Sequence, residues 1–103
     1  MKLDLQIVDD FGPRLADGYK AAEFRAGRVD PYMDICERIT LDFTGVRTAN
    51  SSFVNALVAG AIEQHGARVL DILAFKGCSP SIRVLVESAI CIGMQNIAGK
   101  SNV

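Results

Sequence analysis

Short segments with the two-residue period of a strand alternate along this chain with longer segments that have the period of a helix. Residues 3–7 alternate apolar and polar, which predicts a strand at or near the edge of a sheet. Residues 38–43 predict a second strand, ended by the turn-forming pair Thr44 and Gly45. The segment 67–75 is apolar almost throughout, so we expect a third strand there in the interior of the sheet.

Helical segments fill the intervals between these strands. A helix is predicted from Asp17 onward, and Pro31 must interrupt it, with Asp30 placed to cap a second short helical turn. Residues 52–64 carry apolar side chains at helical spacing on one face. Gly66 follows at the position of a left-handed stop, so this helix is expected to end there.

The last predicted helix has clear boundary signals. Ser79 is its expected N-cap, Pro80 its first residue and Gly93 its end, and the tail 98–103 is expected to fray. Strands that alternate with helices of this length favour an α/β fold, with a mixed, mostly parallel sheet and helices packed on it. We expect one domain over residues 1–103.

Composition narrows the classes of function. A chain of 103 residues, 50% of them hydrophobic, is long enough for one core. Its net charge of −1 comes with scattered Lys and Arg residues, which favours neither nucleic acid nor a membrane surface as a partner. The amino end reads as part of the fold, and the longest uncharged stretch, 48–62, is too short to span a bilayer. We therefore expect a cytoplasmic protein.

Motifs for common enzyme chemistry are absent from the sequence. Neither a phosphate-binding nor a dinucleotide-binding glycine motif occurs, so no nucleotide cofactor is expected. His65 lies at the far end of the helix that begins at Ser51 and Ser52, about 20 Å away, which argues against a catalytic triad. His65 is the only histidine and no cysteine pair lies near it, so no metal site is expected. The chain reads as a non-enzyme.

One residue keeps an enzymatic alternative open. Cys78 follows Lys76 and precedes the start of the last helix, and both features would lower the pKa of its thiol. No acid–base partner can be identified for it, so a small residue in a tight turn is the simpler interpretation.

Two adjacent hydroxyls, Ser51 and Ser52, lie where an apolar helix begins. They could cap the helix, or one could accept a phosphoryl group, which a helix amino terminus stabilises. The stretch LDFTGVRTANSSFVNAL, the following RVLDILAF and the final SPSIRVLVESAICIG together resemble the STAS-like domains, which are related to the STAS domains of anti-sigma factor antagonists. The resemblance covers residues 38–93 and implies a STAS-like fold.

The resemblance implies a partner-switching module of bacterial signal transduction. Such a domain binds a histidine-kinase-like ATPase or an anti-sigma factor, and is phosphorylated on the first serine of the pair. Carried over, the phosphoacceptor is Ser51. Two residues differ from the STAS pattern: Asn50 replaces an acid and Phe53 replaces a glycine.

We therefore predict a non-catalytic regulatory domain that binds a protein partner at the loop 47–55 and the helix that follows. The residues predicted to contact the partner are Arg47, Asn50, Ser52, Phe53 and Asn55. The alternative function is a small-ligand sensor that binds an anion or nucleotide at a helix terminus near the strand ends. The sequence indicates no oligomeric state.

Overall fold

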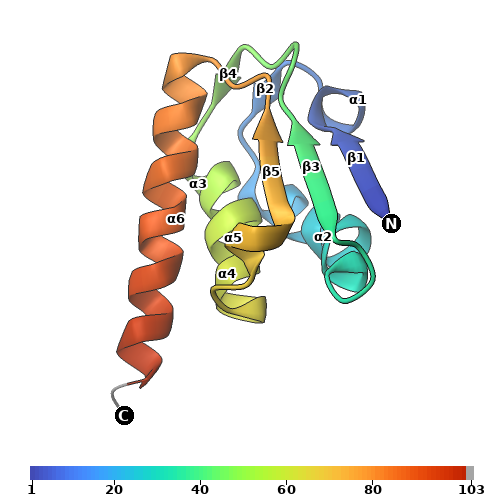
Figure 1. The fold of residues 1–103 in the computed structure, drawn as a ribbon. Coiled ribbons are helices and arrows are strands. Elements are labelled where there is room, and N and C mark those ends of the chain that lie inside the picture. The colour runs from blue at the N-terminus through green and yellow to red at the C-terminus, as the bar shows by residue number, and fades with distance from the viewer. Residues whose placement is uncertain (102–103) are drawn as a thin grey trace.

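The computed structural model describes residues 1–101, which form a parallel sheet with helices packed on it (Figure 1). The elements in chain order are β1 (Lys2–Gln6), α1 (Ile7–Phe11), β2 (Arg14–Leu15), α2 (Gly18–Arg28), the 3-10 turn η1 (Asp30–Tyr32), β3 (Arg38–Asp42), β4 (Thr48–Ala49), α3 (Ser51–Val54), the π-helical η2 (Asn55–Ala59), α4 (Gly60–His65), α5 (Val69–Ile72), β5 (Leu73–Lys76) and α6 (Pro80–Ser101).

The main sheet has the order β1-β3-β5, and every strand pairing among the described residues is parallel. Leu5 is paired with Leu41, and Leu41 is paired with Phe75, so apolar residues of the three strands line up in register. A small separate ladder pairs β2 with β4. The predicted α/β fold with a parallel sheet and packed helices is confirmed, as is the edge position of the first strand.

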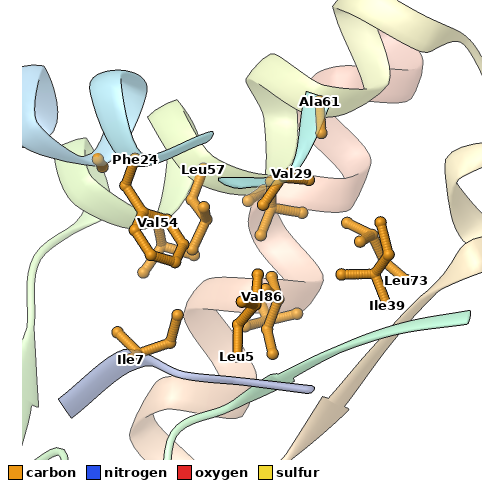
Figure 2. Packing of buried hydrophobic residues seen from close by; sticks show 14 of the residues in the cluster. Leu5, Ile7, Phe24, Val29, Ile39, Val54, Leu57, Ala61, Leu73 and Val86 are labelled. Atoms are coloured by element: carbon orange, nitrogen blue, oxygen red, sulfur yellow. The ribbon is translucent and has the colours of Figure 1, made fainter. Parts of the chain in front are cut away.

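Helices cover one face of the sheet. Figure 2 shows Leu5, Ile39 and Leu73 of the strands directed toward Val29, Leu57 and Val86 of the helical segments. Strand residues that alternate with these, such as Lys2, Asp4 and Arg38, are exposed. The alternation of residues 3–7 thus reflects one buried face and one open face.

The third strand is shorter and placed differently from our prediction. Residues 69–72 form α5, a helical turn in which Val69 is buried, and only Leu73–Lys76 is extended. Turn hydrogen bonds from Val69 N–H to the Gly66 carbonyl and from Leu70 N–H to the Ala67 carbonyl hold the chain in this turn. β5 also lies at the edge of the sheet, with β3 in the centre, so the predicted interior position is wrong.

α6 begins as predicted and ends later than predicted. Ser79 Oγ accepts a hydrogen bond from Ile82 N–H at 3.3 Å, which confirms the cap. Gly93 does not end the helix, because α6 continues to Ser101; a Cβ at Gly93 would lie 2.9 Å from Ile62 Cβ, so the glycine allows α6 to approach α4 closely. The predicted fraying at 98–101 is therefore wrong, and 102–103 lie outside the described residues.

α6 packs mainly on η2 and α4, and Figure 1 shows it beside the β5 edge, extending past the rest of the fold. By length and composition alone, Pro80–Gly99 would suffice to cross a membrane, and 22% of that window is buried within the structure. The core helix of a soluble protein passes the same test.

The two middle helices follow the predicted boundaries closely. Asp17 caps α2 by accepting hydrogen bonds from the N–H groups of Tyr19 and Lys20, and Gly66, with a φ of +85°, ends α4. We predicted that Asp30 would cap the short turn around Pro31, and this prediction is wrong, because no side-chain capping bond forms there. The Asp30 carboxylate is instead bound by side chains of α2 and α4, described below.

Candidate functional site

Asn50 is the residue that caps α3. Its Oδ1 accepts a hydrogen bond from Phe53 N–H at 2.9 Å, and its Nδ2 donates one to the Ala16 carbonyl at 2.9 Å. Its backbone N–H donates to the Leu15 carbonyl, also at 2.9 Å. The first turn of α3 is therefore held against the segment that follows β2, and the expectation that Ser51 caps the helix is wrong.

Ser51 and Ser52 occupy the first two helical positions after this cap, and both are exposed. Within the described chain, neither hydroxyl makes a hydrogen bond, because Asn50 already supplies the capping oxygen. The backbone of Ser52 lies close to the start of α2: a Cβ on Gly18 would lie 3.1 Å from the Ser52 carbonyl oxygen. The structure therefore presents two free hydroxyls on a fixed backbone at the junction of two helix amino termini.

Phe53 belongs to the core and does not contact solvent as a partner residue would. It is 1% exposed and makes an edge-to-face contact with Phe11, with the ring centroids 4.8 Å apart. Phe11 makes a second such contact with Phe24 at 5.3 Å. The large ring that follows the serines therefore anchors the start of α3 in the core, and we remove Phe53 from the predicted contact surface.

The other predicted contact residues differ in accessibility. Arg47 is exposed, and its backbone N–H donates to the Pro13 carbonyl at 2.8 Å, which holds the loop beside β2. Asn55 is half-buried at the start of η2, and its carbonyl accepts a hydrogen bond from Gly60 N–H. Arg47, Ser51, Ser52 and, in part, Asn55 therefore remain available on the surface.

A shallow apolar hollow adjoins Ser52. Its volume is about 590 Å³, and its lining includes Ala16, Tyr19, Ala22 and Ser52. Tyr19 is 87% exposed, so its ring is accessible at the edge of this hollow. Our sequence reasoning missed this contribution from α2, because nothing in the local pattern places Tyr19 beside residues 33 positions later.

Asp42, at the end of β3, has a local structural role. Its Oδ1 accepts hydrogen bonds from Thr44 Oγ1 at 2.6 Å and from Thr44 N–H at 2.9 Å. These two bonds, together with the nearby Lys76 ammonium, hold the pKa of the Asp42 carboxyl below its ordinary value despite partial desolvation. Gly77, with a φ of +69°, leaves room for the turn, because a Cβ there would lie 2.7 Å from Thr44 N.

The surroundings of Cys78 argue against the alternative of an activated thiol. Burial raises the pKa of the Cys78 thiol above its ordinary value, and the nearby Arg83 opposes this shift only in part. The residue lines a small hollow of about 220 Å³ between β5 and α6. A raised pKa leaves less thiolate at neutral pH, so the structure favours the simpler interpretation of Cys78.

His65 is bound by residues remote from the serines. Its Nε2 lies 2.8 Å from Asp30 Oδ1, and the second oxygen of Asp30 lies 3.4 Å from Arg25 Nε. Arg25 Nη1 also donates to the Ala56 carbonyl at 3.2 Å. This cluster joins α2, η1, η2 and α4. His65, the histidine that a serine triad would need, is bound to Asp30 within it.

Comparison with known proteins agrees with this architecture. The family model described as a STAS-like domain of unknown function (DUF4325) matches residues 20–83, a segment that runs from the first turn of α2 into the start of α6. Searches of curated proteins and of solved structures found no significant match. The match covers more than half of the chain and includes the serine pair, β3 and β5. The parallel sheet, the packed helices and this match together establish that the chain belongs to the family of STAS-like domains.

Proposed function

We propose that this chain is a non-catalytic regulatory domain that binds a protein partner through the α3-start surface. We define that surface as Tyr19, Arg47, Ser51, Ser52 and the accessible part of Asn55. The observation that carries the proposal is the pair of exposed, unbonded hydroxyls beside an apolar hollow. Protein interfaces combine apolar and polar groups in this way: an aromatic side chain contributes contact area, and polar groups fix the orientation of the partner.

Ser51 is the proposed point of regulation. Transfer of the ATP γ-phosphoryl group to Ser51 Oγ, with release of ADP and a proton, would place a charge of about −2 at the helix amino terminus. The fold tolerates this charge, because the N–H groups of the first turn and the helix dipole stabilise an anion there. The same charge is costly in an interface that covers the apolar hollow, so phosphorylation would release the partner.

The identity of the partner is proposed from family resemblance. A histidine-kinase-like ATPase, acting as an anti-sigma factor, would supply both the binding surface and the phosphoryl group. The chain can serve as bait in its native cell, and the recovered complex is then incubated with ATP. Intact-mass measurement of the chain should show one added phosphoryl group in the wild type and in Ser52→Ala, and none in Ser51→Ala.

The binding test compares two exposed serines. Ser51→Asp should weaken partner binding by 10-fold or more, whereas Ser88→Asp, on the exposed side of α6, should leave the affinity unchanged. Circular dichroism and urea unfolding would show whether both variants remain folded. Unchanged partner affinity in a folded Ser51→Asp variant would eliminate the switch, and equal losses in both variants would eliminate the proposed surface.

A further inference from the structure

A second hollow opens beside the aromatic cluster of Phe11, Phe24 and Phe53. It has a volume of about 520 Å³, and it meets the apolar hollow of the partner surface at Ala16 and Asp17. Its volume lies in the range of small-molecule sites, about 300–1,000 Å³. Phe11 is the partly exposed ring of the three, whereas Phe24 and Phe53 are buried at 8% and 1% exposure, and Phe11 makes edge-to-face contacts with both of them.

Charged side chains of both signs surround these rings. Arg14, Lys20 and Glu23 line the hollow, and all three are exposed. Among the described residues, none of the three makes a hydrogen bond or ion pair through its side chain. Asp10 and Asp17 also line the hollow, but both are engaged: Asp10 pairs with Arg28 at 3.3 Å, and Asp17 caps α2. The free groups are thus two cations and one carboxylate.

One cation of the chain already lies beside two residues that line the hollow, Phe24 and Asp10. The guanidinium carbon of Arg28 lies 5.5 Å from the centroid of the Phe24 ring, while its Nη1 pairs with Asp10. A cation over an aromatic face and beside a carboxylate gains from both contacts. Glu23 and Phe11 also line the hollow, where they could receive a cationic group and an apolar one, and Arg14 and Lys20 are available for an anionic group.

We propose that this hollow binds a small zwitterion with an apolar side chain, of the class of hydrophobic α-amino acids. The ligand carboxylate pairs with Arg14 and Lys20, its ammonium pairs with Glu23, and its side chain packs on the Phe11 ring. This inference goes beyond partner binding, because it gives the domain a ligand of its own. The site shares Phe53 with the start of α3, so the ligand would lie next to the turn that presents Ser51 and Ser52.

The test is a titration of the ¹⁵N-labelled chain with L-phenylalanine, followed by NMR chemical shifts. We expect saturable shifts around the hollow with a Kd of about 1 mM or tighter, since small ligands reach only modest affinities. 3-Phenylpropionate lacks the ammonium, phenethylamine lacks the carboxylate, and L-alanine lacks the apolar side chain. Each should bind at least 10-fold more weakly than L-phenylalanine.

Two substitutions at exposed positions test the cationic and the acidic side of the hollow one at a time, and neither changes a core residue. Arg14→Ala and Glu23→Gln should each weaken L-phenylalanine binding by about 10-fold, as expected for a charged hydrogen bond. Arg38→Ala, an exposed arginine of β3 outside the hollow, should bind as the wild type does. Absence of saturable shifts, binding of either single-charge analogue as tightly as L-phenylalanine, or wild-type affinity in both variants would each overturn the proposal.

Discussion

Asn50 fixes the first turn of α3 with hydrogen bonds inside that turn and to the segment that follows β2. Its side chain accepts from Phe53 N–H and donates to the Ala16 carbonyl, and its backbone donates to the Leu15 carbonyl. Asn50→Ala should lower the free energy of unfolding by about 1–2 kcal/mol, because an N-cap and a long-range bond are lost together. Ser51→Ala should change it by less than about 0.5 kcal/mol. Urea unfolding measures both, and equal losses would return the capping role to Ser51.

Asp42 should make stability depend on pH. Its pKa is depressed in the folded state, chiefly by the Thr44 hydroxyl, so the ionised carboxylate stabilises the fold at pH values above the unfolded pKa of about 3.9. That contribution is lost as the pH falls through the lower, folded pKa. Asp42→Asn should therefore be less stable than the wild type at neutral pH, and the difference should disappear in acid.

Unfolding in urea at a series of pH values from about 7 to 2 would measure this difference. Asp71→Asn is a suitable control. Asp71 is exposed, and among the described residues its carboxylate makes no hydrogen bond or ion pair. The same pH dependence of the difference in both variants would show that the Thr44 bonds do not stabilise the carboxylate.

The run Asn50-Ser51-Ser52 shows what sequence can and cannot predict about single residues. All three side chains are good N-caps, so the start of a helix was predictable within a residue. The choice among them was not, because it depends on the Ala16 carbonyl, 34 positions earlier, which accepts the amide of Asn50. Phe53 is similar: its burial depends on Phe11, which no local pattern connects to it.

The helix from Ser51 to His65 contains a π segment, η2, that no sequence signal predicted. Gly60 N–H donates to the Asn55 carbonyl, while the Ala56 carbonyl accepts the guanidinium of Arg25. Gly60 has no side chain, and a Cβ there would collide with the Arg25 guanidinium. The segment therefore depends on a side chain of α2, 31 positions away, and it occurs in the helix that carries the candidate site.

Two glycines of α6 allow a matched test of how that helix packs. Gly93→Ala should lower the free energy of unfolding by about 1–3 kcal/mol, because its Cβ would lie 2.9 Å from Ile62 Cβ and 3.2 Å from Ala59 Cα. Gly99→Ala should stabilise the fold slightly, by up to about 1 kcal/mol, since no atom lies within 4 Å of its added Cβ. Thermal and urea unfolding would compare them, and a stabilising Gly93→Ala would mean that the two helices do not pack so closely.

The segment 67–75 shows why one element was misassigned. A nearly continuous apolar run fits a buried strand and a buried helical turn about equally well, because periodicity alone does not separate them. Here Gly66 ends α4 and the next three residues form turn hydrogen bonds, so the chain becomes extended only at Leu73. Gly93 was misread for a related reason, since a helix stop and a close helix contact both favour glycine.

At the scale of the molecule, strand patterns predicted the layers better than the order of the strands. The alternation in residues 3–7 correctly indicated one covered face and one open face. The β3-centred order could not be inferred from hydrophobicity, because it depends on where the connections cross. The α3-start surface was predicted only in part, since its α2 residues come from a segment outside the serine motif.

The helical layer is held together across the molecule by Asp30, and a comparison with Asp34 tests this role. Asp30 pairs with His65 of α4 and Arg25 of α2, and its side chain is 21% exposed. Asp34 pairs with Arg68 at a similar distance but is 79% exposed. Asp30→Ala should lower the free energy of unfolding by about 1–3 kcal/mol, because it leaves a largely buried guanidinium without its counter-charge. Asp34→Ala should cost less than about 1 kcal/mol.

Amide hydrogen exchange of both variants would locate the effect as well as measure it. Loss of the Asp30 contacts should increase exchange in η2 and α4, because Arg25 also donates to the Ala56 carbonyl within η2. The exchange in β1 and β3 should change no more than the global loss of stability requires. Equal costs for the two substitutions would show that the Asp30 cluster contributes no more than a surface ion pair. The link between α2 and the helix that presents Ser51 would then rest on apolar packing and on the hydrogen bond from Arg25 to the Ala56 carbonyl.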